Sequence, residues 1–117
     1  MAARALEDRA TGDQVIILID TEESRGEVFR FEYIARSVTT PPPDHVHKDQ
    51  EERVEVLEGQ ISCRMAGLER VLGPGERLTI HPGVSHAVWS ADPRGSRSIG
   101  EFRPAKNTQA IFERSFS

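Results

Sequence analysis

The sequence predicts an all-β fold, a barrel or a sandwich, followed by one short C-terminal helix. Short apolar runs, several of them alternating with polar residues, recur about every ten residues and are separated by Gly, Pro and Asp. The length of 117 residues fits one domain. A helical spacing of apolar residues is found only at the end of the chain.

The apolar and alternating runs are predicted as strands. The clearest is 28–35, in which aromatic residues occupy one face and charged residues the other. Residues 39–44 contain consecutive prolines, which no central strand could hold because proline has no N–H for the ladder, so we expect a stiff connector there. The other predicted strands are 15–19, 53–57, 61–65, 68–72, 78–81, 86–90 and 98–103.

The chain is predicted to divide into a flexible N-terminal segment at 1–13, a β-barrel at 14–106 and a C-terminal helix at 107–117. The helix would present Phe112 and Phe116 on one face, at i and i+4. A helix this short is not stable alone, so we expect it to dock on the barrel.

The composition excludes several classes of partner. A net charge of −4, with acidic and basic residues mixed throughout, argues against nucleic acid. No apolar stretch approaches the roughly 18–20 residues that cross a bilayer. Charged residues and no apolar core in 1–13 argue against a secretory signal, and the lone Cys63 cannot form an internal disulfide. We therefore expect a cytoplasmic protein with no nucleic-acid or membrane partner.

Three histidines lie in two segments that could converge on one point. In an extended segment side chains alternate, so His45 and His47 point the same way. Glu52 lies at the start of the next predicted strand, and His86 follows a tight turn in a separate strand. Two histidines on a surface strand are often only solvated, but the combination with a phased glutamate and a distant histidine favours a metal site.

These residues resemble the first motif of the cupin superfamily, His-x-His, three or four residues, Glu, six residues, Gly. His45, His47, Glu52 and Gly59 match it. The spacing back from Gly59 selects Glu52 over its neighbour Glu51, and strand phase then places Glu52 inside and Glu51 on the solvated surface.

The second cupin motif, Gly, five residues, Pro-x-Gly, two residues, His, three residues, Asn, is matched in part. Gly75, Gly83 and His86 fit, while His81 and Ser90 stand where Pro and Asn are expected. Strand phase points His81 outward or toward the barrel rim, and the alternative is that it lines the site as a fifth ligand.

The resemblance covers about 28–103 and is nearest to small single-domain bacterial cupins, through 51–59 and the Glu-Phe-Arg-Pro at 101–104. It implies a jelly-roll β-barrel, or double-stranded β-helix, that binds one divalent transition metal. Three imidazoles and a carboxylate suit Fe, Mn, Ni, Co, Zn or Cu and do not separate them.

Alternation also predicts a mostly apolar pocket above the metal, suited to a small organic molecule. The alternative is that its aromatic residues merely fill a small core. Tyr33 favours the pocket because its hydroxyl needs a partner, and it is the candidate catalytic acid or base beside the ligands. The other predicted lining residues are Phe29, Phe31, Met65, Leu78 and Val88.

The resemblance implies a metal-dependent enzyme acting on a small oxygenated substrate, such as a dioxygenase, an isomerase or a polyketide-cyclase-like protein. The alternative functions are a non-catalytic metal or metabolite binder and a metal-free storage or structural protein. The intact ligand set counts against the metal-free protein. Open sheet edges predict a homodimer.

Overall fold

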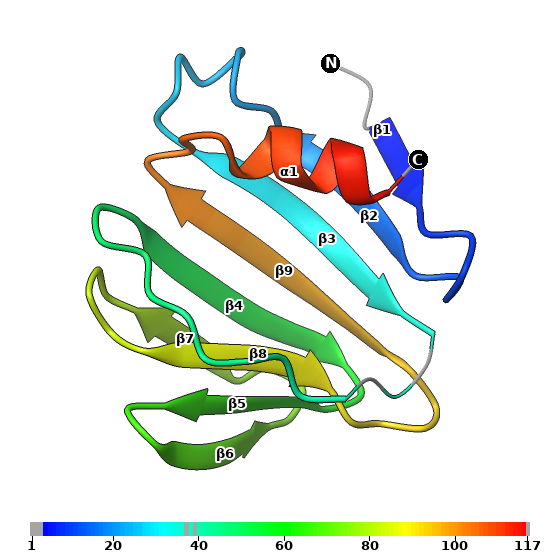
Figure 1. Ribbon diagram of the computed structural model, residues 1–117. Coiled ribbons are helices and arrows are strands. Elements are labelled where there is room, and N and C mark those ends of the chain that lie inside the picture. The colour runs from blue at the N-terminus through cyan, green and yellow to red at the C-terminus, as the bar shows by residue number, and fades with distance from the viewer. Residues whose placement is uncertain (1–3, 37, 39, 117) are drawn as a thin grey trace.

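The protein is described here from a computed structural model that covers residues 4–36, 38 and 40–116. Within these residues the chain forms two β-sheets and one helix (Figure 1). The helix, of eight residues, is too short to span a bilayer. The elements are β1 (Arg4–Glu7), β2 (Gln14–Ile19), β3 (Phe29–Ala35), β4 (Glu51–Glu58), β5 (Ile61–Met65), β6 (Leu68–Leu72), β7 (Arg77–Ile80), β8 (His86–Ser90), β9 (Ser96–Arg103) and α1 (Thr108–Ser115).

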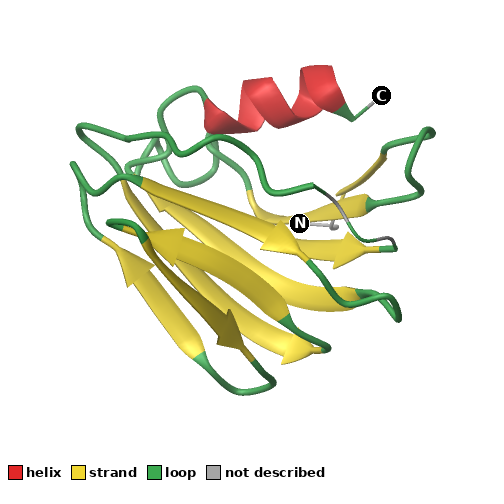
Figure 2. Cartoon of the chain, turned by 60° about the horizontal axis from the view of Figure 1, so that its bottom comes forward, coloured by secondary structure: helices red, strands yellow, loops and turns green. Residues whose placement is uncertain are grey.

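The sheets are antiparallel throughout and are built largely from strands distant in sequence. The larger sheet has the order β1-β2-β3-β9-β4-β7, and the smaller has the order β6-β5-β8. The last strand of the chain, β9, therefore lies between β3 and β4 and pairs with both. Figure 2 shows the strands stacked in layers with α1 to one side of them. The predicted all-β class with a short C-terminal helix is confirmed.

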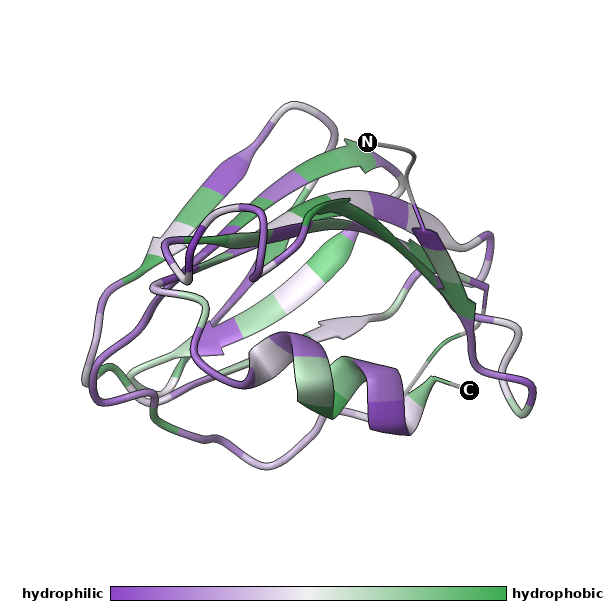
Figure 3. Cartoon of the chain, turned by 90° about the horizontal axis from the view of Figure 1, so that it is seen from above, coloured by the Kyte–Doolittle hydropathy of each residue, from purple (hydrophilic) through white to green (hydrophobic). Residues whose placement is uncertain are grey.

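The buried apolar residues form two clusters. One is formed by β2, β3 and β9 and is covered by α1, whose Phe112 ring meets the Phe31 ring at 4.9 Å between centroids. The other is formed by β4, β5 and β7. In β3, apolar and charged residues alternate from Phe29 to Tyr33, because one face packs on a core while the other meets water, and the hydropathy of the strands varies along their length (Figure 3). The predicted docking face of the helix is thus occupied by aromatic contacts.

The N-terminal segment differs from the flexible one expected for 1–13. Residues Arg4–Glu7 form β1, which pairs with β2, and the Arg4 guanidinium pairs with Glu113 of the helix. Leu6 packs on the first cluster. A strand of four residues with a single large apolar side chain has no pattern that sequence periodicity would detect. Residues 1–3, which belong to the same predicted segment, lie outside the described residues, as do Thr39 of the predicted connector and Ser117 of the predicted helix.

Gly100 in the centre of β9 makes room for an aromatic ring. It is opposite Phe31 of β3 in the sheet register, and a Cβ at this position would stand 2.4 Å from the Phe31 ring atom Cζ. The ring therefore lies directly over the glycine backbone. This contact packs the middle of the inner face of the larger sheet.

Replacing Gly100 by alanine should lower the free energy of unfolding by about 1–3 kcal/mol, because the added methyl group displaces a buried ring. Urea denaturation of the variant beside wild type measures the change. Gly73→Ala is the matched control, since its Cβ would meet only Glu76 Oε1 at 3.6 Å. Equal stability of both variants would contradict the packing role of Gly100.

Candidate metal centre

The two histidine segments meet through the backbone. His45 and His86 form an isolated β-bridge, in which each N–H donates to the other residue's carbonyl oxygen at 2.9 Å. The connector before β4 is thereby attached to the start of β8. The carbonyl oxygen of His47 accepts a further hydrogen bond from the Gly83 N–H at 2.9 Å. These backbone bonds bring the His45 and His86 rings to 4.3 Å between centroids.

Glu52, near the start of β4, lies close to the three histidines. Its Oε1 lies 3.1 Å from His86 Nε2 and 3.7 Å from His47 Nε2. One ligand atom from each of His45, His47, Glu52 and His86 can be chosen so that all four lie within 4.8 Å of one another. The structure therefore assembles the four predicted ligand residues into a group that could hold a metal ion.

The contact between Glu52 and His86 needs a positive charge. His86 Nδ1 is 2.8 Å from the carbonyl oxygen of Val84, which can only accept, so Nδ1 carries a proton. A neutral ring then has a lone pair on Nε2, which would face the carboxylate lone pair at 3.1 Å. A second proton relieves this repulsion, and the hydrogen bond to Glu52 accordingly raises the pKa of His86. A metal cation between the two atoms would relieve it equally well.

The partly buried imidazole of His47 shows the same need for a cation. His47 Nε2 is buried and has no hydrogen-bond partner among the described residues. Burial lowers the pKa of His47, so the ring is neutral at neutral pH and keeps a lone pair for a metal. The residues thus fit a divalent metal. At metal–ligand bonds of about 2.0–2.2 Å, adjacent ligand atoms lie roughly 3 Å apart, which matches the Glu52–His86 contact.

The two alternative ligands, Glu51 and His81, lie on the outer face, away from the ligand group. Glu51 accepts a hydrogen bond from Arg53 Nε at 2.8 Å, and His81 Nδ1 lies 3.7 Å from Glu51 Oε1. The His81 side chain is 72% exposed, whereas that of His86 is 1% exposed. Strand alternation therefore separates an inner Glu52–His86 pair from an outer Glu51–His81 pair, and His81 is not in the ligand group.

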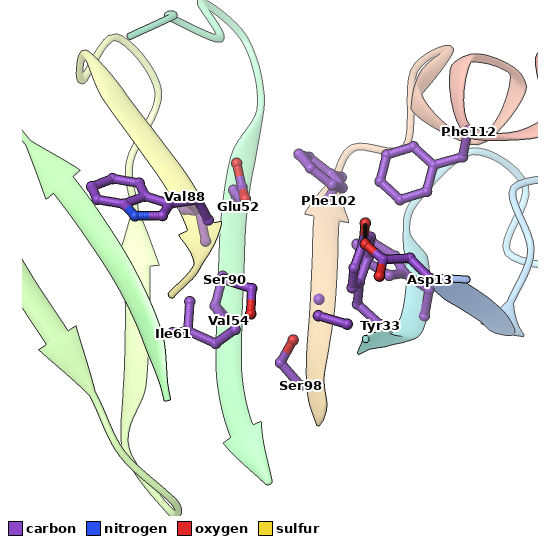
Figure 4. A pocket seen from close by; sticks show the side chains of 14 residues that line it. Asp13, Tyr33, Glu52, Val54, Ile61, Val88, Ser90, Ser98, Phe102 and Phe112 are labelled. Atoms are coloured by element: carbon purple, nitrogen blue, oxygen red, sulfur yellow. Dashed lines mark hydrogen bonds between the residues drawn. The ribbon is translucent and has the colours of Figure 1, made fainter. Parts of the chain in front are cut away.

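Glu52 of the ligand group is one of the residues that line a cavity of about 230 Å³. Glu52 lies at one end, at the level of Phe102 in the register of β4 and β9, while Tyr33 is level with Ser98 on β9. Four residues of strand, roughly 13 Å, separate the two levels. Figure 4 shows how the labelled side chains are arranged around this space. The residues that line it are Asp13, Phe31, Tyr33, Ala35, Glu52, Val54, Ile61, Val88, Trp89, Ser90, Ser98, Gly100, Phe102 and Phe112.

The structure places the predicted pocket residues in two environments. Phe31, Tyr33 and Val88 line the cavity. Phe29, Met65 and Leu78 are not among its lining residues, and they pack in or against the two core clusters. Alternation gives the side of the sheet on which a residue lies, but it does not show which residues on that side reach the cavity.

Several lining residues were not predicted. The alternation of 98–103 places Ser98, Gly100 and Phe102 on one face, so that a signal for them was present. Phe112 reaches the cavity from the helix. Asp13 had no such signal, because it lies in a polar segment just before β2.

Asp13 and Tyr33 form a buried polar pair at the end of the cavity away from the ligands. The Tyr33 hydroxyl donates to Asp13 Oδ2 at 2.9 Å, and the Arg36 backbone N–H donates to Asp13 Oδ1 at 2.8 Å. Burial, followed by the hydrogen bond and the negative charge of Asp13, raises the pKa of Tyr33 far above its ordinary value. The phenol is therefore a neutral hydrogen-bond donor at all physiological pH values.

The raised pKa of Tyr33 predicts a loss of stability in alkali. The unfolded chain releases the phenolic proton near pH 10 while the folded protein retains it. The contribution of Tyr33 to the free energy of unfolding is fully present below about pH 10 and is lost as the pH rises further. Tyr33 is the only tyrosine, so the ultraviolet absorbance of the phenolate reports it directly. Phenolate should form only together with unfolding, and Tyr33→Phe should show a smaller decline of melting temperature with pH; ionisation near pH 10 in the folded state would contradict the burial argument.

Comparisons with known proteins place this geometry among related folds. No known family model matches the chain. An oxidoreductase from the fungus Arthrobotrys oligospora is 35% identical over 49 residues, which are 41% of this chain and 19% of that protein. The chain therefore covers only about a fifth of the length of this relative.

Solved structures match over most of the chain. KdgF from Halomonas sp. superposes with a TM-score of 0.71 at 19% identity, over 93% of this chain and 91% of that one. An RmlC-like cupin from Shewanella frigidimarina has a TM-score of 0.70 at 22% identity, over 89% and 86%. Ectoine synthase from P. lautus has a TM-score of 0.70 at 15% identity, over 95% and 77%. The predicted double-stranded β-helix is thus confirmed, and the chain has the same fold as these solved structures.

Proposed function

We propose that this protein binds one divalent transition metal through His45, His47, Glu52 and His86 and acts as a metal-dependent enzyme on a small oxygenated organic molecule. The observation that carries the proposal is that Glu52, one of the four grouped residues, also lines a mostly apolar cavity. A structural metal site has no need of such a cavity, whereas an enzyme needs one to hold its substrate.

The donor set supports an open rather than a closed site. Structural zinc sites are usually rich in cysteine, and the only cysteine, Cys63, is buried in the second core cluster away from the ligand group. Four protein ligands leave positions for water or substrate on a metal that accepts six. When bound, the metal would supply Lewis-acid polarisation of a substrate oxygen or a lowered pKa for a bound water.

The protein's own residues would hold the substrate and exclude water. Phe31, Val54, Val88 and Phe102 provide apolar walls, and Phe112 of α1 closes one side. A cavity of about 230 Å³ with mostly apolar lining suits a small organic molecule. Tyr33, whose hydroxyl donates to Asp13, would position a polar group of the substrate at the far end.

A second candidate function is a non-catalytic metal or metabolite binder. It is favoured by the small number of residues in the cavity that could act as a general acid or base. Among the cavity-lining residues only Asp13, Tyr33 and Glu52 are titratable, and Glu52 is one of the four metal-ligand candidates. The raised pKa of Tyr33 makes it a poor proton donor for fast chemistry at neutral pH. The absence of turnover with metal bound would favour this binder.

The homodimer and the cytoplasmic location stay predictions. Support for self-association comes from β6, an edge strand on which Leu68 and Val71 are 77% and 55% exposed. Exposed apolar residues on an unpaired edge favour pairing with another strand.

Metal content should separate the two adjacent glutamates. Protein purified without added metal should contain close to one metal ion per chain by elemental analysis, and Glu52→Ala and His47→Ala should reduce this at least tenfold, because each removes a ligand. Glu51→Ala and His81→Ala are the matched controls, being the same residue types on the outer face. Their circular dichroism and melting temperatures verify folding. Wild-type protein without metal, with a melting temperature unchanged by chelators or added metal, would refute the site.

Catalysis is tested by oxygen uptake with the metal-loaded protein against a panel of catechols and small diketones. A dioxygenase should consume oxygen with one of them, and Glu52→Ala should abolish the consumption while Glu51→Ala retains it. Product analysis of the same mixtures by mass spectrometry detects an isomerase or cyclase. No change in any compound, with metal content intact, would favour the binder.

A further inference from the structure

The far end of the cavity contains a carboxylate whose charge is incompletely compensated. The side chain of Asp13 lines the cavity, and the residue is only 3% exposed. Its two side-chain hydrogen bonds come from neutral donors, the Tyr33 hydroxyl and the Arg36 backbone N–H. No ion pair among the described residues includes Asp13. Burying a charge is costly unless it is paired or fully hydrogen-bonded.

The polar atoms at this end have capacity to accept more hydrogen bonds. A carboxylate offers about four acceptor positions, and the recorded donors use two of them. The Tyr33 oxygen has directed its proton to Asp13, so its lone pairs are free to accept. Ser98 lies opposite Tyr33 in the sheet register and lines the same space (Figure 4). This end of the cavity therefore favours a group that donates hydrogen bonds, and most of all one that is positively charged.

We propose that Asp13 and Tyr33 form a distal subsite that binds a donor group of the substrate, an ammonium or a hydroxyl. The substrate would then have three parts: a metal-binding oxygen near Glu52, an apolar body between Phe31 and Val54, and a donor group at Asp13. The inference rests on the proposed function, since the metal fixes the opposite end of the molecule. In this proposal the positive or donor group of the ligand balances the charge of the Asp13 carboxylate, which no described side chain balances.

The competing explanation is structural. Asp13 precedes β2, and its bonds to Tyr33 and Arg36 attach the β1–β2 turn to the end of β3. A clamp of this kind would stabilise the fold but would not distinguish between ligands. A ligand comparison therefore separates the two explanations, whereas a stability measurement alone does not.

The test compares probes that differ only at the distal end. Benzohydroxamate provides two metal-binding oxygens and an apolar ring, and its 4-aminomethyl and 4-hydroxy derivatives add an ammonium or a hydroxyl. Calorimetry with metal-loaded wild-type protein should show the 4-aminomethyl compound binding about tenfold tighter than benzohydroxamate, with the hydroxyl compound between them, as expected for a charge-assisted hydrogen bond. Equal affinities for all three would overturn the subsite.

Variants locate the preference. Asp13→Asn keeps the shape and removes the charge, so the tenfold preference should disappear while benzohydroxamate itself binds as before. Asp8→Asn is the matched control, because its carboxylate contacts the exposed Ala10 N–H in the same turn. Tyr33→Phe should retain the preference for the ammonium, since Asp13 keeps its charge. A clamp alone would weaken all three probes equally in Asp13→Asn and Tyr33→Phe, and that result would overturn the proposal.

A metal-free arm separates this inference from the metal site. Metal-stripped protein should be stabilised by benzylamine more than by the neutral benzyl alcohol, in thermal melts, and Asp13→Asn should remove the difference. A metal site that fails in elemental analysis while this difference persists would refute the proposed function and leave the subsite. A confirmed metal site with no such difference would refute the subsite.

Discussion

The backbone bridge between His45 and His86 is the contact on which the site depends. Two hydrogen bonds of 2.9 Å attach the proline-rich connector to the start of β8. Because this connector leads into β4, the bridge links β4 of the larger sheet to β8 of the smaller sheet. The connector has no other strand pairing within the described residues. Because a residue in a bridge has a defined direction for its side chain, the bridge directs both imidazoles toward Glu52. His47 follows two residues later and points the same way.

Strand alternation then sorts the charged residues of β4. Glu52 is directed toward the histidines, while Glu51 and Arg53 form an ion pair on the outside. A shift of one residue in the register with β7 or β9 would exchange the two glutamates, so the register contacts of β4 with both neighbours are as important to the site as the ligands. Gly100 contributes by admitting the Phe31 ring, which forms part of the cavity wall next to Val54 of β4.

The cavity is apolar between two charged ends. At one end Glu52 faces imidazoles, where a proton or a metal ion balances its charge. At the other end Asp13 relies on two neutral donors. Both ends hold buried or nearly buried carboxylates, which are unfavourable in a small domain of limited core. A ligand that brings a metal-binding oxygen to one end and a donor to the other would compensate both, and the fold would then be stabilised by its own ligands.

The sequence by itself determined the fold class, the strands from 14 to 103, the short helix and the four candidate ligands, because periodicity and motif spacing are local properties. It also selected Glu52 over Glu51 through the motif spacing back from Gly59, and strand phase then placed Glu52 inside. Only the tertiary structure decided which residues line the cavity. Phe29 and Leu78 have the right phase but pack in the core clusters without lining the cavity, and Asp13 comes from a segment without any apolar pattern. The pairing of β1 and the His45–His86 bridge were likewise decided by the tertiary structure. The position of a residue relative to the cavity and the meeting of distant segments depend on how the sheets close, and no local sequence pattern records that.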